Sequence, residues 1–272
     1  IISKIRSLTL AREKTLQGEE ANRINVLLLG MGGVGHDGAT LTDTIIFTSL
    51  RPSDDAVGML SIPRDLQILL ANKEYSRINA VNAFAELKQP GSGGQAVAEM
   101  VSNILQQPIN YYLRLDFKAF EEIIDAVGGI DVKIEQSFYD PFYPDENFGY
   151  EPVSFTAGTE HMNGQRALKF VRSRHGTNGE GNDFARARRQ QKVLFALKER
   201  LLSFNILLHP KRIKSILESL TNNIQTNIAF WEGMRLGKTL RNIKTEQIIS
   251  RVLDSAPDGV LRERNYNGAF VL

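Results

Sequence analysis

Short apolar runs rich in β-branched residues alternate with segments of helical periodicity over the first half of the chain, and this alternation constrains the fold most strongly. Residues 24–29 form a continuous apolar run that predicts a buried strand. Residues 44–50 and 56–62, separated by the turn residues 52–55, predict a β-hairpin. Strands that alternate with helices indicate a three-layer α/β fold.

The same periodicities predict the remaining elements. We expect helices over 76–88, 94–107, 117–127, 164–172, 184–202, 209–221 and 228–242, and strands over 109–115, 130–134 and 248–253. Asp116 is placed to cap the helix that follows it, and Gly128-Gly129 to end that helix. Residues 138–155 hold seven of the 22 aromatic residues, and we expect a loop there. Such a loop is pinned by its own aromatic cluster or is a lip that stacks on sugar or lipid.

Composition excludes several classes of protein. The 272 residues include no cysteine, which excludes a disulfide framework, a Cys-ligated zinc site and a Cys nucleophile. With 33 basic and 31 acidic residues, the chain as a whole does not favour a nucleic-acid partner. The sequence begins with Ile1 rather than Met, so we expect residues 1–23 to be an arm that follows a removed membrane anchor. Residues 24–272 show no linker or repeat and are expected to form one domain.

A glycine-rich stretch after the first predicted strand imitates a dinucleotide-binding motif. Residues 30–35 read GMGGVG and fit G-x-G-x-x-G. That motif requires a helix to open directly after the glycines, so that its N-terminus meets the pyrophosphate. Here a polar loop and then a predicted strand follow, which argues against a nicotinamide cofactor.

The densest positive charge lies between Arg166 and Lys192, where eight basic residues face two acidic ones. Such a run is usually a solvated helix face. However, stepping back by three or four residues from the apolar stripe of the helix over 184–202 places Arg186 and Gln190 on the buried side. A buried arginine requires an anion or a carboxylate, and Asp183 at the helix start could orient Arg186 or cap the helix.

Other charged residues could complete a phosphate site. Arg172 and Arg174 alternate about Ser173, which would put both guanidinium groups on one side of an extended segment. Paired arginine forks near a helix start suit a doubly charged phosphate or pyrophosphate. Arg64 follows a predicted strand, and Asp43 begins another. A carboxylate beside bound phosphate would naturally hold Mg²⁺; in simpler interpretations Arg64 is a surface cation paired with its neighbour and Asp43 caps a turn.

Seven segments together resemble the LytR-CpsA-Psr family of bacterial cell-wall glycopolymer transferases. They are NVLLLG at 25–30, LTDTIIFTSLRP at 41–52, MLSIPRD at 59–65, RINAVNAF at 77–84, DFKAFEEIIDAVGGIDV at 116–132, GTEHMNGQRALKFVRSR at 158–174 and NDFARARRQQKVL at 182–194. The resemblance implies an Mg²⁺-dependent phosphotransferase on the extracytoplasmic face of the membrane. Its substrate would be a glycopolymer on polyprenyl pyrophosphate and its acceptor peptidoglycan. Its fold would be a three-layer mixed β-sheet flanked by helices, with an apolar groove for the prenyl chain.

The resemblance also assigns roles to individual residues. Catalytic roles fall to Asp43, Arg64, Arg172, Arg174, Asp183 and Arg186, and substrate-binding roles to Arg64, Arg77, Arg172, Arg174, Arg186 and Gln190. Asp43 is the expected metal ligand. Many members carry an aspartate after the first strand and an arginine two residues before the Asp-Thr pair, where this chain has 31–33 (MGG) and Leu41. Asp37 or His36 could replace the missing group, and we expect Asp37 as the second ligand.

The sequence allows two rival functions. The incomplete aspartate pair allows a non-catalytic polyprenyl-pyrophosphate-binding or regulatory protein of the cell envelope. Nucleic-acid binding through residues 166–192 is less favoured, because the arginines lie on an inward stripe and few aromatics are interleaved for base stacking.

Overall fold

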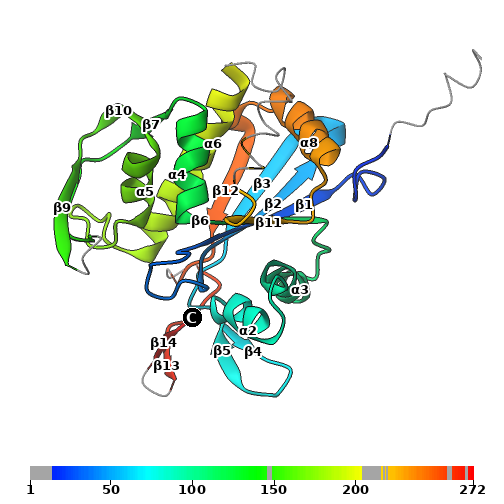
Figure 1. Ribbon diagram of the computed structural model, residues 1–272, viewed down its shortest axis with the longest axis horizontal. Helices are drawn as coiled ribbons and strands as arrows, with labels where there is room; N and C mark the ends of the chain where they lie inside the picture. The colour runs from blue at the N-terminus through cyan, green and yellow to red at the C-terminus, as the bar shows by residue number, and fades with distance from the viewer. Residues whose placement is uncertain are drawn as a thin grey trace, which may run out of the picture.

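The computed structural model describes residues 14–145, 149–203, 216, 218, 220–255, 259–266 and 269–272. Its centre is a six-stranded sheet in the order β11-β6-β1-β2-β3-β12 (Figure 1). The strands of this sheet are β1 (Ile24–Met31), β2 (Thr42–Arg51), β3 (Ala56–Ser61), β6 (Tyr111–Asp116), β11 (Ile224–Thr226) and β12 (Ile248–Val252). β1 pairs antiparallel with β2 and parallel with β6, which confirms the predicted mixed sheet.

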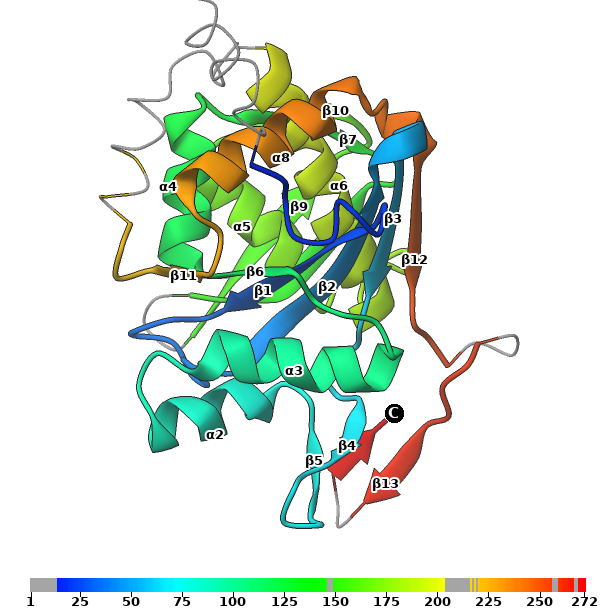
Figure 2. The same cartoon turned by 90° about the vertical axis from the view of Figure 1, so that its right-hand side faces the viewer.

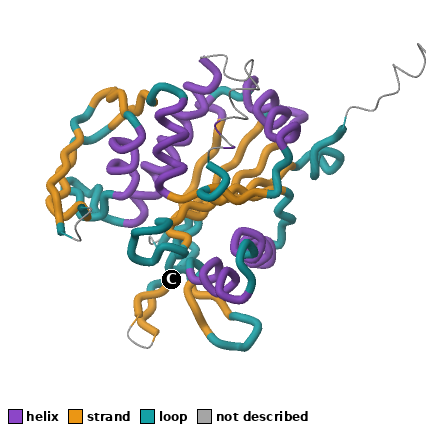
Figure 3. The backbone as a smooth tube through the Cα atoms, in the orientation of Figure 1, coloured by secondary structure: helices purple, strands orange, loops and turns teal. Residues whose placement is uncertain are grey.

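Helices cover both faces of this sheet (Figures 2 and 3). On one face lie α2 (Ala80–Lys88) and α3 (Gly93–Leu105). On the other side lie α4 (Phe117–Ala126), α5 (Gly164–Arg172), α6 (Asp183–Ser203) and α8 (Phe230–Asn242). The chain therefore forms the three-layer α/β arrangement that the alternating pattern predicts.

Alternation along the central strands divides the core between the two faces. Leu27 and Leu29 of β1 join the apolar cluster that includes Val97 of α3. Ile24 and Val26 join the opposite cluster, which includes Leu236 of α8. Because successive side chains of a strand point to opposite faces, a strand covered on both sides is apolar throughout. Each fully buried aliphatic side chain of this kind contributes roughly 1.5–3 kcal/mol.

A further core lies beside the sheet, where α4, α5 and α6 pack against two strand pairs. One pair is β7 (Ile130–Ile134) with β10 (Gly158–Met162), and the other is β8 (Phe138–Pro144) with β9 (Tyr150–Phe155). The predicted loop over 138–155 is therefore wrong. The strand period was hidden because the β8–β9 register shifts between Asp140 and Tyr143, so the buried positions do not alternate evenly.

Several boundaries differ from those predicted. The helix expected over 76–88 begins at Ala80, because β5 (Tyr75–Arg77) pairs with β4 (Gln67–Leu69). The remaining elements are η1 (Pro52–Asp54), η3 (Thr245–Gln247), β13 (Arg264–Tyr266) and β14 (Ala269–Val271). The expected helix over 209–221 lies mostly outside the described residues, as do residues 1–13 of the expected arm. Among the described residues, we find no helix with the length and apolar content needed to cross a bilayer.

Local signals fixed the ends of α4 as predicted. The Asp116 carboxylate accepts a hydrogen bond from the backbone N–H of Ala119 at 2.9 Å, which caps the helix. At the other end Gly128 and Gly129 have φ of 78° and 81°, a conformation that glycine adopts most readily. The glycine-rich loop after β1 leads directly into strand β2, so it has no helix N-terminus to offer a pyrophosphate.

Candidate functional site

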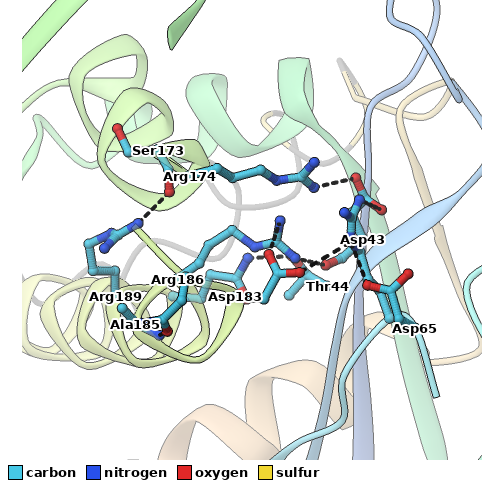
Figure 4. A network of polar contacts seen from close by, with 12 residues as sticks. Asp43, Thr44, Asp65, Ser173, Arg174, Asp183, Ala185, Arg186 and Arg189 are labelled. Atoms are coloured by element: carbon cyan, nitrogen blue, oxygen red, sulfur yellow. Dashed lines mark hydrogen bonds and ion pairs between the residues drawn. The ribbon is translucent and has the colours of Figure 1, made fainter. Parts of the chain in front are cut away.

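Asp43, near the start of β2, is the centre of a cluster of arginines (Figure 4). Its Oδ1 accepts a hydrogen bond from Arg64 Nη1 at 3.0 Å, and its Oδ2 accepts one from Arg174 Nη2 at 3.1 Å. Arg186 Nη2 reaches the Asp43 backbone carbonyl at 3.4 Å. Three arginines from distant segments therefore converge on Asp43, two on its carboxylate and one on its backbone carbonyl.

The fold brings these segments to one edge of the sheet. In the β2–β3 hairpin Ile46 pairs with Ser61, so the start of β2 and the end of β3 lie side by side. The backbone N–H of Ile62 then donates to Ile45 O at 2.8 Å, which extends this pairing towards Asp43 and Arg64. The end of α5 and the first turn of α6 supply the other two arginines.

Arg186 is buried, as its place on the inward stripe of α6 predicts, with 5% of the residue exposed. Its Nη1 lies 2.9 Å from Asp183 Oδ1 in an ion pair. Asp183 does not cap α6, because the Asn182 Oδ1 accepts from the backbone N–H of Ala185 at 2.8 Å. Of its two predicted roles, the structure therefore gives Asp183 that of orienting Arg186.

The ion pairs hold two carboxylates around Arg64. Its Nε lies 3.4 Å from Asp65 Oδ2 and 3.7 Å from Asp183 Oδ2. Arg77 on β5 donates to Asp65 Oδ1 at 2.8 Å, so Arg77 acts on the cluster through Asp65. Within the described part of the chain, the buried Arg64 Nε and Arg186 Nη1 have no hydrogen-bond acceptor of suitable geometry. These two N–H donors are the unsatisfied groups of the cluster.

The charges of the cluster shift the pKa values of its members. Burial opposes ionisation of Asp43, but the charges of Arg64 and Arg174 outweigh it and hold the pKa of the carboxyl below its usual value. Burial, followed by the charge of Arg174, lowers the pKa of Arg186 to about 10. Burial and the charge of Arg64 also lower the pKa of Arg174. Arg186 and Arg174 are thus held close to other cations in a partly dry site, which an anion would stabilise.

Gln190 and Arg172 take different places relative to this cluster. Gln190 Nε2 donates to Thr44 Oγ1 at 2.8 Å, one residue from Asp43. Arg172 Nη1 instead donates to Tyr143 Oη at 3.1 Å, and its guanidinium lies 4.4 Å from the centre of the Phe117 ring. The expectation that Arg172 and Arg174 point the same way is therefore wrong. Arg172 is the last residue of α5 and Arg174 lies beyond the helix end, so the two do not share one extended segment.

Asp37 and His36, which we expected to replace the missing metal ligand, lie in the loop after β1. Asp37 is exposed there, and His36 packs against Phe117 with ring centres 5.0 Å apart. Burial and the nearby charge of Arg172 lower the pKa of His36. Among the described residues no cluster of three or more His, Asp or Glu side chains forms a ready-made metal site.

A pocket of about 210 Å³ opens beside the arginine cluster. Asp43, Arg64 and Arg186 form its polar wall. Its apolar wall comes from the sheet, from α6 and from the last residues of the chain, and consists of Ile45, Ile62, Pro63, Phe184, Ala187, Val252, Phe270 and Leu272. The pocket therefore joins a polar side, where arginines and carboxylates meet, to an apolar side.

Three residues that shape the site were not among those predicted. Arg189, 2% exposed, donates to the carbonyl oxygens of Phe170 and Ser173, and so ties the end of α5 to α6. Asp140, 1% exposed, accepts from the backbone N–H groups of Arg174 and His175. Asp65 bridges Arg64 and Arg77 as described above. Arg189 lies on the same buried helical stripe as Arg186, so helical periodicity could have found it; Asp140 had no such signal.

The fold and the cluster define a class: a mixed α/β protein with a largely buried cluster of arginines and carboxylates beside a partly apolar pocket. The match to the LytR_cpsA_psr family model extends over residues 3–269, and the chain belongs to this family.

Relatives and a solved structure agree with this assignment. The chain is 33% identical over 222 residues to the polyisoprenyl-teichoic acid–peptidoglycan teichoic acid transferase TagV of Bacillus subtilis, covering 80% of this chain and 54% of TagV. It is 30% identical over 240 residues to the corresponding transferase TagU of Bacillus cereus, covering 86% of this chain and 71% of TagU. The crystal structure of B. subtilis TagV superimposes with a TM-score of 0.68 at 27% identity, covering 92% of this chain and 90% of that structure. In the sequence alignment, the chain spans about half the length of TagV.

Proposed function

We propose that this chain is a phosphotransferase that moves a glycopolymer from a polyprenyl-pyrophosphate carrier to peptidoglycan. The observation that carries the proposal is the pair of buried guanidinium N–H groups, on Arg64 and Arg186, that lie near carboxylates without a well-aligned hydrogen-bond acceptor, beside a partly apolar pocket. A prenyl diphosphate supplies acceptor oxygens to the guanidinium groups and an apolar chain to the pocket. The names of TagV and TagU support a substrate of this class. The reaction takes place at the extracytoplasmic face of the cell membrane, where both substrates are found.

In the proposed reaction, the hydroxyl oxygen of the acceptor attacks the sugar-linked phosphorus. A new P–O bond forms to the acceptor, and the bond between that phosphorus and the bridging oxygen breaks, so polyprenyl phosphate leaves with the electron pair. Arg64, Arg174 and Arg186 bind the diphosphate oxygens and stabilise the charge that develops on them. We propose Asp183 as the candidate base for the hydroxyl proton, since its side chain is 41% exposed and lines the pocket. Water in place of the acceptor gives hydrolysis as a side reaction.

Mg²⁺ fits this site as a partner of the substrate. Asp43 is a hard oxygen ligand that is kept ionised, and each of its oxygens retains a lone pair beyond the one bonded to an arginine. Mg²⁺ commonly binds one or two carboxylates together with substrate phosphates, so Asp43 and the diphosphate would hold it, with Asp37 as the proposed second protein ligand. Bound there, the ion would neutralise charge on the phosphate oxygens.

One observation favours a second function. The chain has Leu41 where many relatives have an arginine, and the described residues offer no cluster of three metal-ligating side chains. A protein that binds the lipid diphosphate without cleaving it, in a regulatory role, would need only the arginines.

The test is metal-dependent release of phosphate from geranyl pyrophosphate, together with transfer of the glycosyl phosphate of a glycosylated prenyl diphosphate to a peptidoglycan acceptor. We expect activity in the wild type and a loss of about 10²-fold in Arg174→Gln. Arg235→Gln is the matched control. Arg235 is on α8, outside the cluster, and its guanidinium forms an ion pair with Glu19 at 2.8 Å. Binding without release would favour the regulatory function. Equal turnover in Arg174→Gln and the wild type would refute the proposed role of the cluster.

A further inference from the structure

The β8–β9 hairpin carries exposed aromatic rings at a place next to the arginine cluster. Phe142 is 52% exposed and Tyr150 is 67% exposed. Their rings meet edge to face with centres 5.8 Å apart, and Phe142 makes a second perpendicular contact, also at 5.8 Å, with the ring of His175. Three rings from two segments of the chain thus form one open cluster, which we call the aromatic platform.

The backbone joins this platform to the arginine cluster. The register shift between Asp140 and Tyr143 lifts Phe142 out of the regular strand pairing. Asp140 then holds both sides: its Oδ1 accepts from the Phe142 N–H at 3.0 Å, and its Oδ2 accepts from the N–H groups of Arg174 and His175 at 3.0 and 3.1 Å. Arg174 in turn donates to Asp43. A single buried carboxylate therefore fixes the platform beside the residue that reaches the site.

The character of the platform suits a sugar better than a lipid. Its rings are open, and they carry polar groups, the Tyr150 hydroxyl and the His175 ring nitrogens, at their edges. A pyranose ring presents an apolar C–H face and hydroxyls at its rim, and this combination matches amphipathic aromatic rings. The aliphatic residues that suit a prenyl chain line the pocket instead, where Ile62 and Val252 lie.

Position decides which sugar the platform takes. The pocket is lined by Arg64 and Arg186, whereas the platform is joined to Arg174, which donates to the other oxygen of Asp43. In phosphoryl transfer the attacking and leaving oxygens lie roughly in line across the phosphorus. With the leaving polyprenyl phosphate in the pocket, the acceptor approaches from outside it, and none of Phe142, Tyr150 and His175 lines the pocket.

We propose that Phe142, Tyr150 and His175 form a binding subsite for a sugar ring of the acceptor glycan. This inference rests on the proposed function, because that function sets the direction of attack. It adds a specificity-determining surface that the phosphate chemistry itself does not require.

The test is NMR titration with chitotetraose, a soluble chain of N-acetylated hexosamines, in parallel with geranyl pyrophosphate. We expect Phe142→Ala and Tyr150→Ala to weaken chitotetraose binding by about 2- to 10-fold. Their affinity for geranyl pyrophosphate should equal that of the wild type. Tyr139→Ala is the matched control, since Tyr139 lies on the same hairpin and is 47% exposed, and it should leave both affinities unchanged.

The two proposals fail in different ways. The platform is refuted if the wild type does not bind chitotetraose, or if both platform variants bind it as the wild type does. It is also refuted if those variants lose affinity for geranyl pyrophosphate, which would make the platform a lipid or donor site. In the transfer reaction, KM for the acceptor should rise while KM for the donor stays constant. Failure of the wild type to bind geranyl pyrophosphate would instead refute the proposed function.

Discussion

Asp140→Asn should both destabilise the protein and loosen the arginine cluster, although Asp140 touches no arginine side chain of that cluster. The Asp140 carboxylate is 1% exposed and accepts three backbone hydrogen bonds, one on Oδ1 and two on Oδ2. The substitution keeps the shape of the side chain and replaces one acceptor oxygen by an N–H₂ group. It therefore tests the hydrogen bonds rather than the packing.

The size of the effect follows from the number of bonds lost. An amide oriented to keep the two bonds from Arg174 and His175 points its N–H₂ group at the Phe142 N–H, so two donors face each other. Loss of one hydrogen bond to a charged group costs about 1.5–3 kcal/mol, and leaving the part-buried Phe142 N–H without an acceptor adds at most about 1–3 kcal/mol. We expect the free energy of unfolding to fall by about 3–5 kcal/mol, because the two bonds that remain are also weaker with a neutral acceptor.

Urea unfolding followed by circular dichroism measures this loss. Asp131→Asn is the matched control: Asp131 is on β7, its side chain is 57% exposed, and it pairs with the half-exposed His161. That change should stay within about 0.5 kcal/mol of the wild type. In the folded Asp140→Asn protein, geranyl pyrophosphate should also bind more weakly, since Arg174 is less well held. A loss below about 1 kcal/mol with unchanged affinity would refute the role given to Asp140.

Two further predictions concern the cluster itself. Asp43→Asn should lower the free energy of unfolding at neutral pH by about 2 kcal/mol, because it weakens charge-assisted bonds to two arginines. The folded-state pKa of Asp43 is lowered, so this stabilisation is present above the usual pKa near 3.8 and is lost as the pH falls through the lower folded value. The urea midpoints of the variant and the wild type should therefore converge in acid. A difference that stays constant with pH would contradict the assignment. Arg186→Gln should weaken geranyl pyrophosphate binding by about 10- to 100-fold in calorimetry. The Arg186→Gln substitution should lower the free energy of unfolding by less than about 1 kcal/mol, since burial and neighbouring cations already disfavour the charge of Arg186. A large loss of stability with intact binding would show that the role of Arg186 is structural.

Much of the fold could be predicted from local pattern. The apolar run that became β1 and the Asp116 cap with its Gly128-Gly129 stop are short-range signals, and the structure confirms them. The β8–β9 hairpin was missed because a register shift breaks the two-residue period on which strand prediction depends. β5 was missed for a different reason: a three-residue strand is too short to show a period, and it is fixed by its pairing with β4.

The site was predicted in part, for comparable reasons. Helical periodicity alone predicts that Arg186 lies on the buried side of α6, and the burial of Arg186 confirms that prediction. The partners of Arg172 could not be predicted, because they depend on where the helix ends and on Tyr143, which a distant hairpin supplies. Asp140 was missed because it bonds backbone N–H groups. Nearly every residue has such a group, so the sequence does not show which ones Asp140 contacts.

A crystal structure with geranyl pyrophosphate and Mg²⁺ would test most directly whether the arginine cluster is a diphosphate site. We predict diphosphate oxygens within hydrogen-bonding distance of Arg64, Arg174 and Arg186. The prenyl chain should lie against Ile62 and Phe270 in the pocket. The three arginines would then exchange part of their contact with Asp43 for contact with the ligand. A diphosphate bound elsewhere, with the arginines still paired only to carboxylates, would contradict it.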